Sequence, residues 1–326
     1  MFVLESKIEI GSYVFERVNN VEITKSVDLL SDTASITMPF SATFGSDTSG
    51  FIRKPLEEEI NVGDPVKIYL GYKDVIWTLE FEGFITAIKP NIPSITFECE
   101  DAIWKIRQKT VNKSFINTSL KDVLNAVLTD TGIEMADNVP DVVFDQFIIK
   151  QANGAQALQK VKDEFGLFMF IQDDGKLYAG LRENTNFGET VNYNLQRNVI
   201  SSDLTFRRAE DVRIYLKVVG VLPNNQRIEV QVGDPTGEER TIFRYSVSDT
   251  QQLRRLGEAE LANLVYTGYE GSITGFLAPF CTRGQNISLS DDIYPKRAGK
   301  YFVPKVVTNY GTGGARREIE VGNRLD

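Results

Sequence analysis

The sequence contains no histidine and only two cysteines among its 326 residues. Without an imidazole, Ser-His-Asp and Cys-His nucleophiles are excluded, and so are most zinc sites. The cysteines, Cys99 and Cys281, form no CxxC motif and lie in apolar or alternating stretches. We therefore interpret both as small buried packing residues and predict neither a disulfide nor a reactive thiol.

Apolar runs long enough to cross a bilayer are also missing. Runs such as Leu167 to Ile171 are far below the ~20 apolar residues that a membrane-spanning helix needs. The first residues carry Glu5, Lys7 and Glu9 where a signal peptide would have its apolar core. We expect no export signal and no insertion of this chain into a membrane.

An excess of positive charge is the third absence. The chain has 36 lysines and arginines against 45 aspartates and glutamates, a formal net charge of −9. A reader of duplex DNA depends on clustered cations, so this balance disfavours that class. The remaining composition, 42% hydrophobic and 25% charged, is typical of a folded globular protein, and 326 residues suffice for about two domains.

The first hundred residues predict short strands bounded by Gly, Asp or Pro. Apolar and polar residues alternate at 8–10, 21–23, 34–38, 66–70, 77–88 and 95–99. This succession is typical of a barrel or sandwich, and we assign residues 1–108 to a first β-barrel. The small, polar stretch from Ser41 to Arg53 is predicted to be a long loop that could act as an interaction arm. Gly83, inside a strand pattern, predicts a bulge or barrel corner.

Residues 109–200 change to helical periodicity. After Thr118-Ser119, apolar residues recur at intervals of three and four through Leu128, which predicts an amphipathic helix capped by Gly132. A second helix is predicted over 154–166, followed by a hairpin with an Asp-Asp-Gly-Lys turn. We assign this segment to a small α/β domain.

Strand alternation returns near residue 201. We assign residues 201–233 and 270–326 to a second β-barrel, interrupted by a helical excursion at 234–269 with a helix from about Ser248 to Val265. The predicted fold class is mainly β with α+β insertions.

Three segments of the first β unit recur in the same order in the second. They are Gly63 to Ile68 with Gly284 to Leu289, Phe84 to Ile88 with Phe302 to Val306, and Ile95 to Glu98 with Ile319 to Val321. Such a repeat suggests that one chain carries two like barrels. Coincidence is the alternative, because a glycine, an apolar alternation and a turn recur in many β proteins.

One triplet matches a protease signature. Asp130-Thr131-Gly132 has the short pattern of aspartic proteases, in which two carboxylates share a proton. The triplet occurs once and follows an amphipathic helix, so we interpret it as a helix end.

Three carboxylate clusters could supply the acid and base of a glycosidase: Glu57-Glu58-Glu59, Asp173-Asp174 and Asp291-Asp292. Each lies in turn or loop sequence, where solvated carboxylates are typical. Gly311-Thr312-Gly313-Gly314 is interpreted as a turn between strands and not as a phosphate cradle. The sequence thus predicts no catalytic, cofactor-binding or metal-binding residue and no enzymatic activity.

The succession of these segments resembles the late-control gene D family, the hub proteins of contractile phage baseplates, and the hub half of type VI secretion spike proteins. The resemblance rests on short segments spread over the whole chain: Val21 to Pro39, Gly63 to Val66, Phe81 to Ile85, Phe115 to Leu128, Asp211 to Gly220, Gly271 to Gly275, Gly299 to Val303 and Gly313-Gly314.

The resemblance implies two tail-tube-like β-barrels per chain with small peripheral α/β domains. It also implies a homotrimer whose six barrels form a pseudo-sixfold ring between a sixfold tail tube and a threefold spike. A threefold ring presents six similar surfaces only if each subunit supplies two. The implied partners are the tail tube protein, the spike protein and a tape-measure protein, with DNA passing through the lumen without specific binding. The implied location is the virion tail baseplate, after synthesis in the cytoplasm of the bacterial host.

Two other functions remain open. A carbohydrate-binding β protein of the cell or virion surface would expose Trp77, Trp104, Tyr266 and Tyr269 as a row of rings in a groove, whereas a hub would bury them. An enzyme would place two carboxylates about 5 to 9 Å apart in one cleft.

Overall fold

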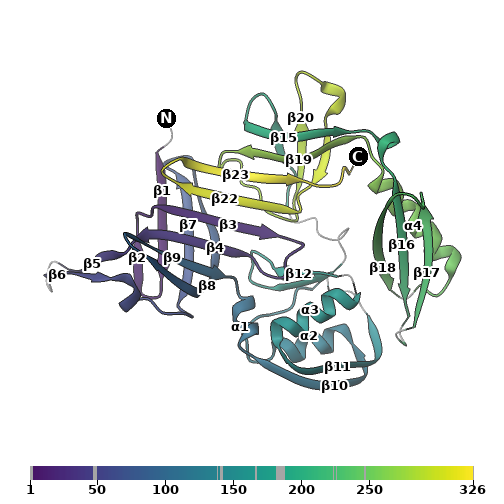
Figure 1. Cartoon of the computed structure of the whole chain (residues 1–326), viewed down its shortest axis with the longest axis horizontal. Helices are drawn as coiled ribbons and strands as arrows, with labels where there is room; N and C mark the ends of the chain where they lie inside the picture. Colours follow the sequence, from purple (N-terminus) through teal and green to yellow (C-terminus); the bar gives the residue numbers. More distant parts are fainter. Residues whose placement is uncertain are drawn as a thin grey trace.

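In the computed structural model, one large sheet contains strands from both the N-terminal and the C-terminal parts of the chain. The structure describes residues 3–46, 50–137, 139, 142–165, 167–180, 188–222, 224, 226–245 and 247–325. The eleven strands of the sheet follow the order β15-β19-β23-β22-β3-β4-β9-β8-β7-β1-β2. Figure 1 shows the yellow strands β22 and β23 above the purple strands β3 and β4. Hydrogen bonding between β22 and β3 therefore joins the N-terminal and C-terminal β units.

The strands of this sheet come from two separate stretches of sequence. The first supplies β1 (Leu4–Ile10), β2 (Tyr13–Phe15), β3 (Asn20–Ser26), β4 (Thr33–Pro39), β7 (Pro65–Tyr72), β8 (Ile76–Asn91) and β9 (Ser94–Glu100). The second supplies β15 (Val199–Arg207), β19 (Gly268–Gly275), β22 (Lys305–Gly311) and β23 (Gly314–Val321). The predicted strands of the first hundred residues are confirmed, as is the prediction of a mainly β chain.

Burial follows the alternation of the sequence. In β3, Val21 and Ile23 are buried and Glu22 is exposed, because successive side chains of a strand point to opposite faces. The buried side chains of the first unit form one hydrophobic cluster, to which Leu277, Tyr310 and other residues of the second unit contribute. The two β units therefore share a core as well as a sheet.

The stretch from Ser41 to Arg53 is not a loop, and this prediction was wrong. It forms a hairpin of β5 (Ser41–Ser46) and β6 (Gly50–Pro55), in which Phe44 lies opposite Ile52. The hairpin projects from the sheet in Figure 1. Its small and polar residues hid the strand pattern, because they lack the apolar alternation by which a strand is recognised in a sequence. Residues 47–49, which connect the two strands, lie outside the described residues.

Gly83 is not at a bulge. It pairs regularly with Val66, and the two irregularities of β8 lie beside Glu80 and Thr86. Gly83 is required for another reason: a Cβ there would lie 2.2 Å from the carbonyl oxygen of Glu100. The glycine therefore permits close approach of two backbones.

The middle of the chain forms an α/β unit. Its helices are α1 (Ile103–Arg107), α2 (Leu120–Leu128) and α3 (Gly154–Phe165), and its strands are β10 (Thr110–Ser119), β11 (Val143–Asn153), β12 (Phe168–Ile171) and β13 (Leu177–Gly180). A capping box between Ser119 and Asp122 starts α2. Helices α2 and α3 and the β12–β13 hairpin are confirmed, whereas α1, β10 and β11 were not predicted. The predicted last residue of the second helix, 166, lies outside the described residues.

A third unit stands apart from the large sheet. Strand β16 (Ile214–Val221) pairs with β17 (Arg227–Gly233) on one side and with β18 (Glu238–Tyr245) on the other. The three strands pack on α4 (Thr250–Leu264) around their own hydrophobic cluster. The sequence analysis placed the first two of these strands in the second barrel and missed β18. Alternation reveals a strand but not the sheet that it joins.

The second β unit is completed by a small sheet of β14 (Val191–Asn194), β20 (Asn286–Ser290) and β21 (Gly299–Phe302). The predicted strand from Tyr301 to Val307 is divided into β21 and β22 around Pro304, which has no N–H to donate to a ladder. Among the described residues no helix is long and apolar enough to span a membrane.

The sequence repeat has a structural counterpart at one turn. Gly63 and Gly284 both have positive φ, +94° and +79°. The N–H of Gly63 donates to the carbonyl of Ile85 at 2.8 Å, and the N–H of Gly284 donates to the carbonyl of Val303 at 2.8 Å. The sequence repeat aligns Ile85 with Val303. In return, the N–H groups of these two partners donate to the carbonyls of Asp64 (3.0 Å) and Gln285 (2.9 Å).

The same turn is closed by equivalent side chains. A carboxylate oxygen of Asp64 accepts from the N–H of Asn61 at 2.8 Å, and the amide oxygen of Gln285 accepts from the N–H of Thr282 at 2.9 Å. Position by position, the hydrogen bonding of this turn is therefore duplicated although its residue types differ.

The ladders extend the duplication. Ala34-Ser35-Ile36-Thr37 lies opposite β9 as Gly271-Ser272-Ile273-Thr274 lies opposite β23. Ile36 faces Phe97 and Ile273 faces Ile319, so Phe97 and not Ile95 is the counterpart of Ile319. The register thus corrects the third aligned segment by two residues.

Candidate functional site

The face of the large sheet opposite the hydrophobic core is polar in both β units. In β23, Ile319 and Val321 are buried while Glu318 and Glu320 are exposed, and β19 likewise alternates Ile273 with Ser272 and Thr274. Directly paired residues of neighbouring strands share a face. The register therefore determines which side chains form this surface.

The polar face is continuous across the junction of the two units. One row of paired residues runs from Arg316 to Asn309, Glu22, Ser35 and Glu98, crossing from β23 through β22, β3 and β4 to β9. We call this surface, formed by the outward side chains of β15, β19, β23, β22, β3, β4 and β9 with the end of β8, the polar face.

Carboxylates outnumber cations on the polar face. Its acidic side chains are Asp203, Glu270, Glu318, Glu320, Glu22 and Glu98, and its basic ones are Arg207, Lys305, Arg316 and Lys89. Two of the cations are neutralised in place, since Lys89 pairs with Glu98 and Arg207 with Glu270. The surface that remains carries net negative charge.

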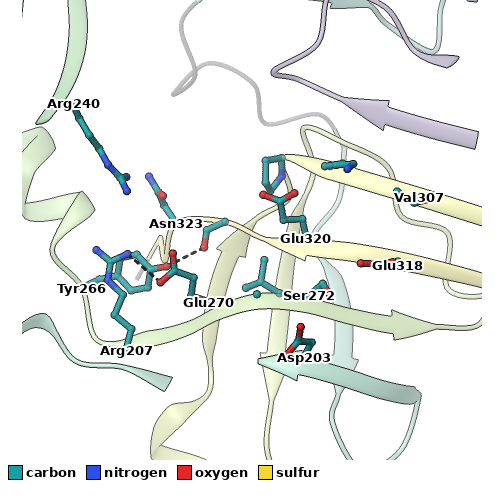
Figure 2. A pocket seen from close by; sticks show the side chains of 15 residues that line it. Asp203, Arg207, Arg240, Tyr266, Glu270, Ser272, Val307, Glu318, Glu320 and Asn323 are labelled. Atoms are coloured by element: carbon teal, nitrogen blue, oxygen red, sulfur yellow. Dashed lines mark hydrogen bonds and ion pairs between the residues drawn. The ribbon is translucent and has the colours of Figure 1, made fainter. Parts of the chain in front are cut away.

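A hollow of about 380 Å³ lies at the β15 end of the polar face. Figure 2 shows Arg207 directed toward Glu270 and lying beside Tyr266, with Arg240 entering from β18. The Arg207 guanidinium lies 3.6 Å from the carboxylate of Glu270 and 4.8 Å from the centre of the Tyr266 ring. These contacts hold the Arg207 guanidinium in place, so the hollow has a polar lining of fixed shape.

A second cavity, of about 360 Å³, lies where three parts of the chain meet. Arg283, only 2% exposed, contacts Asp32 of the first β unit at 2.7 Å and Asp173 of the β12–β13 turn at 3.3 Å. Asp173 also pairs with Lys25 at 3.0 Å. This ionic network ties the second β unit to the first and to the α/β unit.

Burial dominates the titration of two carboxyls in this network. It raises the pKa of Asp32 and, more strongly, that of Asp101, whose carboxylate accepts from the N–H groups of Asp32 and Ile103. Burial opposes ionisation of Asp173 as well, but Lys25 and Arg283 hold its pKa below the usual value. The carboxyls are held by backbone donors and cations, an arrangement that joins the parts of the chain.

A buried pair joins the two β units elsewhere. Arg317 is fully buried and its guanidinium lies 2.5 Å from Glu80, which is 3% exposed. Arg317 also donates to the carbonyls of Leu277 and Pro279. Glu80 can reach it because the irregularity of β8 leaves this residue unpaired in the ladder.

The sequence analysis missed Arg283, Arg317 and Glu80. A signal was present for Arg317, because it occupies an inward position of the alternation between Ala315 and Ile319. A charge at such a position predicts a buried partner. The identity of that partner is a matter of tertiary structure.

The protease-like triplet belongs to a helix end, as predicted, but not in the predicted form. Helix α2 ends at Leu128, and Asp130 is the first residue after it with a left-handed φ, +64°. The hydroxyl of Thr131 donates to the carbonyl of Leu128 at 2.6 Å. Gly132 lies two residues past Asp130, so it does not cap the helix.

The three carboxylate clusters are held by different parts of the fold. Glu59 accepts from Tyr13 and pairs with Lys54, and Asp174 accepts from the N–H of Lys176 within its turn. Asp291 is 5% exposed and accepts from Tyr269 at 2.5 Å, while Asp292 accepts from Asn194 at 2.8 Å. The expectation that these carboxylates are solvated was wrong for Asp291, which is buried, whereas Asp173 is exposed although it pairs with Lys25 and Arg283.

The four aromatic residues considered for sugar binding do not form one row. Trp77 is 48% exposed and stacks on Tyr69, whereas Trp104 stacks on Phe84 in another part of the unit. Tyr266 lies against Arg207, and Tyr269 is 5% exposed.

Both cysteines are buried and free, as the sequence predicted. Burial raises the pKa of the Cys99 and Cys281 thiols to about 12, so neither is a thiolate at neutral pH. Gly311 to Gly314 forms the predicted turn, here between β22 and β23.

Comparison with known proteins identifies the fold. No family model and no curated protein matches the sequence. Among solved structures, the chain is similar to a tail protein from Neisseria meningitidis, with a TM-score of 0.67, 13% identity and coverage of 100% of this chain and 97% of that one. It is also similar to the 43 kDa tail protein of a Shewanella oneidensis prophage, with a TM-score of 0.65, 14% identity and coverage of 98% of both chains.

A third similar structure comes from a secretion machine. It is an Escherichia coli component of the type VI secretion system, described as structurally similar to the T4 bacteriophage tail proteins gp27 and gp5. The TM-score is 0.58 at 10% identity, over 98% of this chain and 77% of that one. The resemblance that the sequence predicted is therefore confirmed at the level of fold: the chain has the fold of these phage tail and type VI secretion proteins.

Proposed function

We propose that the protein is the structural hub of a phage tail baseplate or of a related injection machine. In this proposal three copies form a ring of six tube-like β-barrels that joins the sixfold tail tube to the threefold spike. The protein acts by presenting surfaces and not by catalysis. The fold shared with phage tail and type VI secretion proteins along nearly the whole chain supports this assignment.

The observation that carries the proposal is the duplicated β unit. The turns at Gly63 and Gly284 repeat their hydrogen bonds, and the ladders around Ile36 and Ile273 repeat their register. A subunit with two like units provides six similar positions to a threefold assembly. This is the geometry that a connection between sixfold and threefold structures requires.

The two units differ where threefold features are needed. The β5–β6 hairpin occurs between β4 and β7, and the corresponding stretch of the second unit, between β19 and β20, contains no strand among the described residues. A ring of three chains would therefore present three hairpins at alternate positions. We assign the near-equivalent surfaces to the tail tube and the threefold ones to the spike.

The polar face is assigned to the lumen. Its net negative charge would repel the phosphate backbone, so DNA would pass without adhering. A tape-measure protein would occupy the same channel before DNA does. In this proposal the protein is made in the bacterial cytoplasm and is located in the virion tail baseplate.

The experiment that tests the proposal measures mass and symmetry together. The purified full chain is analysed by light scattering and then by electron microscopy, alone and after mixing with its spike protein. We expect the mass of three chains and end-on views with six peripheral densities around a channel. A particle that stays monomeric with and without the spike, or whose end-on views lack a channel, would contradict the proposal.

A further inference from the structure

We propose that the outer edge of β15 pairs, in antiparallel register, with the end of β8 in a second copy of this chain, placing Lys89 opposite Thr205. The proposal rests on the assembly put forward above and specifies which strands hold it together. It is built from an internal template, because the chain already contains one junction of the same kind.

The template is the pairing of β22 with β3. Lys305 lies opposite Ser26, Val307 opposite Thr24 and Asn309 opposite Glu22, in a ladder that runs on to Gly311. This ladder joins the second β unit to the first within one chain.

Each partner of the template has a counterpart in the other unit. Strand β3 pairs with β4 as β15 pairs with β19, and the matched ladders make Leu204 the counterpart of Ile23. Strand β22 pairs with β23 as the end of β8 pairs with β9, which makes Ile88 the counterpart of Val306. Within one chain, β22 and β3 are paired with each other. Their counterparts, the end of β8 and β15, are not paired with each other and form two edges.

Both counterpart edges are without a partner strand in the described chain. Strand β15 is at the end of the sheet order. Strand β8 pairs with β7 only up to Phe84, so beyond this point it pairs on one side only, with β9. An open edge of this kind is a template for another strand.

Transferring the template register gives the intermolecular pairs. They are Ala87 with Arg207, Ile88 with Phe206, Lys89 with Thr205, Pro90 with Leu204 and Asn91 with Asp203. Ile88 and Phe206 would form an apolar pair, and Lys89 would lie diagonally across from Asp203. Pro90 has no N–H, so its pair with Leu204 can use only the proline carbonyl.

Exposure at the open edges agrees with a missing neighbour. Ile92 is 79% exposed, the highest value for a large hydrophobic side chain in the described part of the chain, whereas its counterpart Tyr310 is 8% exposed. On the other edge Leu204 is half-buried, whereas its counterpart Ile23 is 1% exposed. Tyr310 and Ile23 are buried because they lie in β22 and β3, which are already paired within the chain.

The contact is head-to-tail, since the two edges are different surfaces of the chain. Such contacts close into a ring when the rotation permits and otherwise extend into a filament. The internal junction and the proposed one have the same register, so the two junctions alternate around the assembly. Three chains would then give six junctions of similar geometry.

The register can be tested by cross-linking cysteines. In the double variant Lys89→Cys/Thr205→Cys, the Cα atoms of the directly opposed residues would lie about 4.5 to 5.5 Å apart, a separation that a disulfide can bridge. The native Cys99 and Cys281 are buried, so they should not compete. We expect mild oxidation of the assembled protein to give covalent dimers and trimers on non-reducing gels.

Two controls calibrate the result. Thr24→Cys/Val307→Cys is the template pair and should form a disulfide within one chain. Mass spectrometry should detect this disulfide while the protein still runs as a single chain on a non-reducing gel. Lys89→Cys/Ser201→Cys moves one partner four residues along the same strand face, about 13 Å away, and should not cross-link. Circular dichroism and thermal unfolding verify that each variant is folded.

The outcomes separate this inference from the proposed function. Trimers that form while Lys89→Cys/Thr205→Cys fails to cross-link, although the template pair closes, would overturn the register and leave the hub proposal standing. Covalent chains longer than three would support the register and contradict the threefold ring. Monomers without intermolecular cross-links would overturn both.

Discussion

At the scale of single residues, two buried arginines connect parts of the chain that are far apart in sequence. Arg317 reaches Glu80, and Arg283 reaches Asp32 and Asp173. A buried ion pair gives little net stability relative to apolar residues, but removal of one partner leaves an uncompensated charge. These contacts therefore specify how the units fit together, and they make the fold sensitive to single substitutions.

Arg317→Met should destabilise the protein by about 3 to 5 kcal/mol, because Glu80 would be left charged and buried. The free energy of unfolding in urea measures the loss. The double variant Glu80→Leu/Arg317→Met should recover most of it. If the free energy of unfolding of Arg317→Met were within about 1 kcal/mol of that of the parent, the pair would not be buried in solution.

Asp101→Asn should change how stability depends on pH. The folded-state pKa of Asp101 is raised, so its stability contribution is complete below the ordinary carboxyl value and is lost as the pH rises through the raised value. The variant lacks this loss. Its free energy of unfolding relative to the parent should therefore rise from pH 4 upward, by at most ~1.4 kcal/mol per pH unit. Urea unfolding at several pH values tests this, and a constant difference would contradict it.

At the scale of secondary structure, the sequence predicted elements that bury one regular face. Helix α2 and strands β3, β4 and β9 were found because apolar residues recur with the helical or the strand period. The β5–β6 hairpin was missed because most of its residues from Ser41 to Gly50 are small or polar and show no apolar alternation. Strand β10 was missed because its buried residues Val111, Phe115 and Thr118 do not recur with the strand period of two.

Gly83→Ala should destabilise the sheet, because its Cβ would meet the backbone of Glu100. A loss of about 1 to 3 kcal/mol is expected from such overpacking. Gly313→Ala is the matched control, since nothing lies within 4 Å of a Cβ at this turn position. Thermal unfolding of both variants gives the comparison. Equal melting temperatures would show that the strands around Gly83 can separate at little cost.

At the scale of the whole molecule, the repeat was visible in the sequence but the joint between its copies was not. Glycines and alternation aligned the two units because each needs the same turn and the same buried face. The pairing of β22 with β3 joins residues nearly 300 positions apart, and no local pattern encodes it. The polar face depends on that pairing, so its continuity could not be predicted. The network around Arg283 was hidden for the same reason.

Reversing charge on the polar face should make the assembled ring bind DNA. The variant Asp203→Lys/Glu318→Lys/Glu320→Lys replaces three carboxylates of this surface by cations, which neutralise phosphates and release counterions. Gel retardation of a short duplex should show tighter, salt-dependent binding than for the parent. Glu57→Lys/Glu58→Lys/Glu134→Lys, with the same charge change away from the polar face, should bind less. Equal binding by the two variants would contradict a lumenal polar face.

The β22–β3 ladder also has a consequence for counting. Because each chain brings two units already joined, a closed ring of these chains can hold only an even number of units, and adding a chain always extends it by two. Half of the junctions in such a ring form during folding, at a rate independent of concentration. The other half require an encounter between molecules. Dilution would therefore dissociate the junctions between chains and leave the junctions within each chain intact.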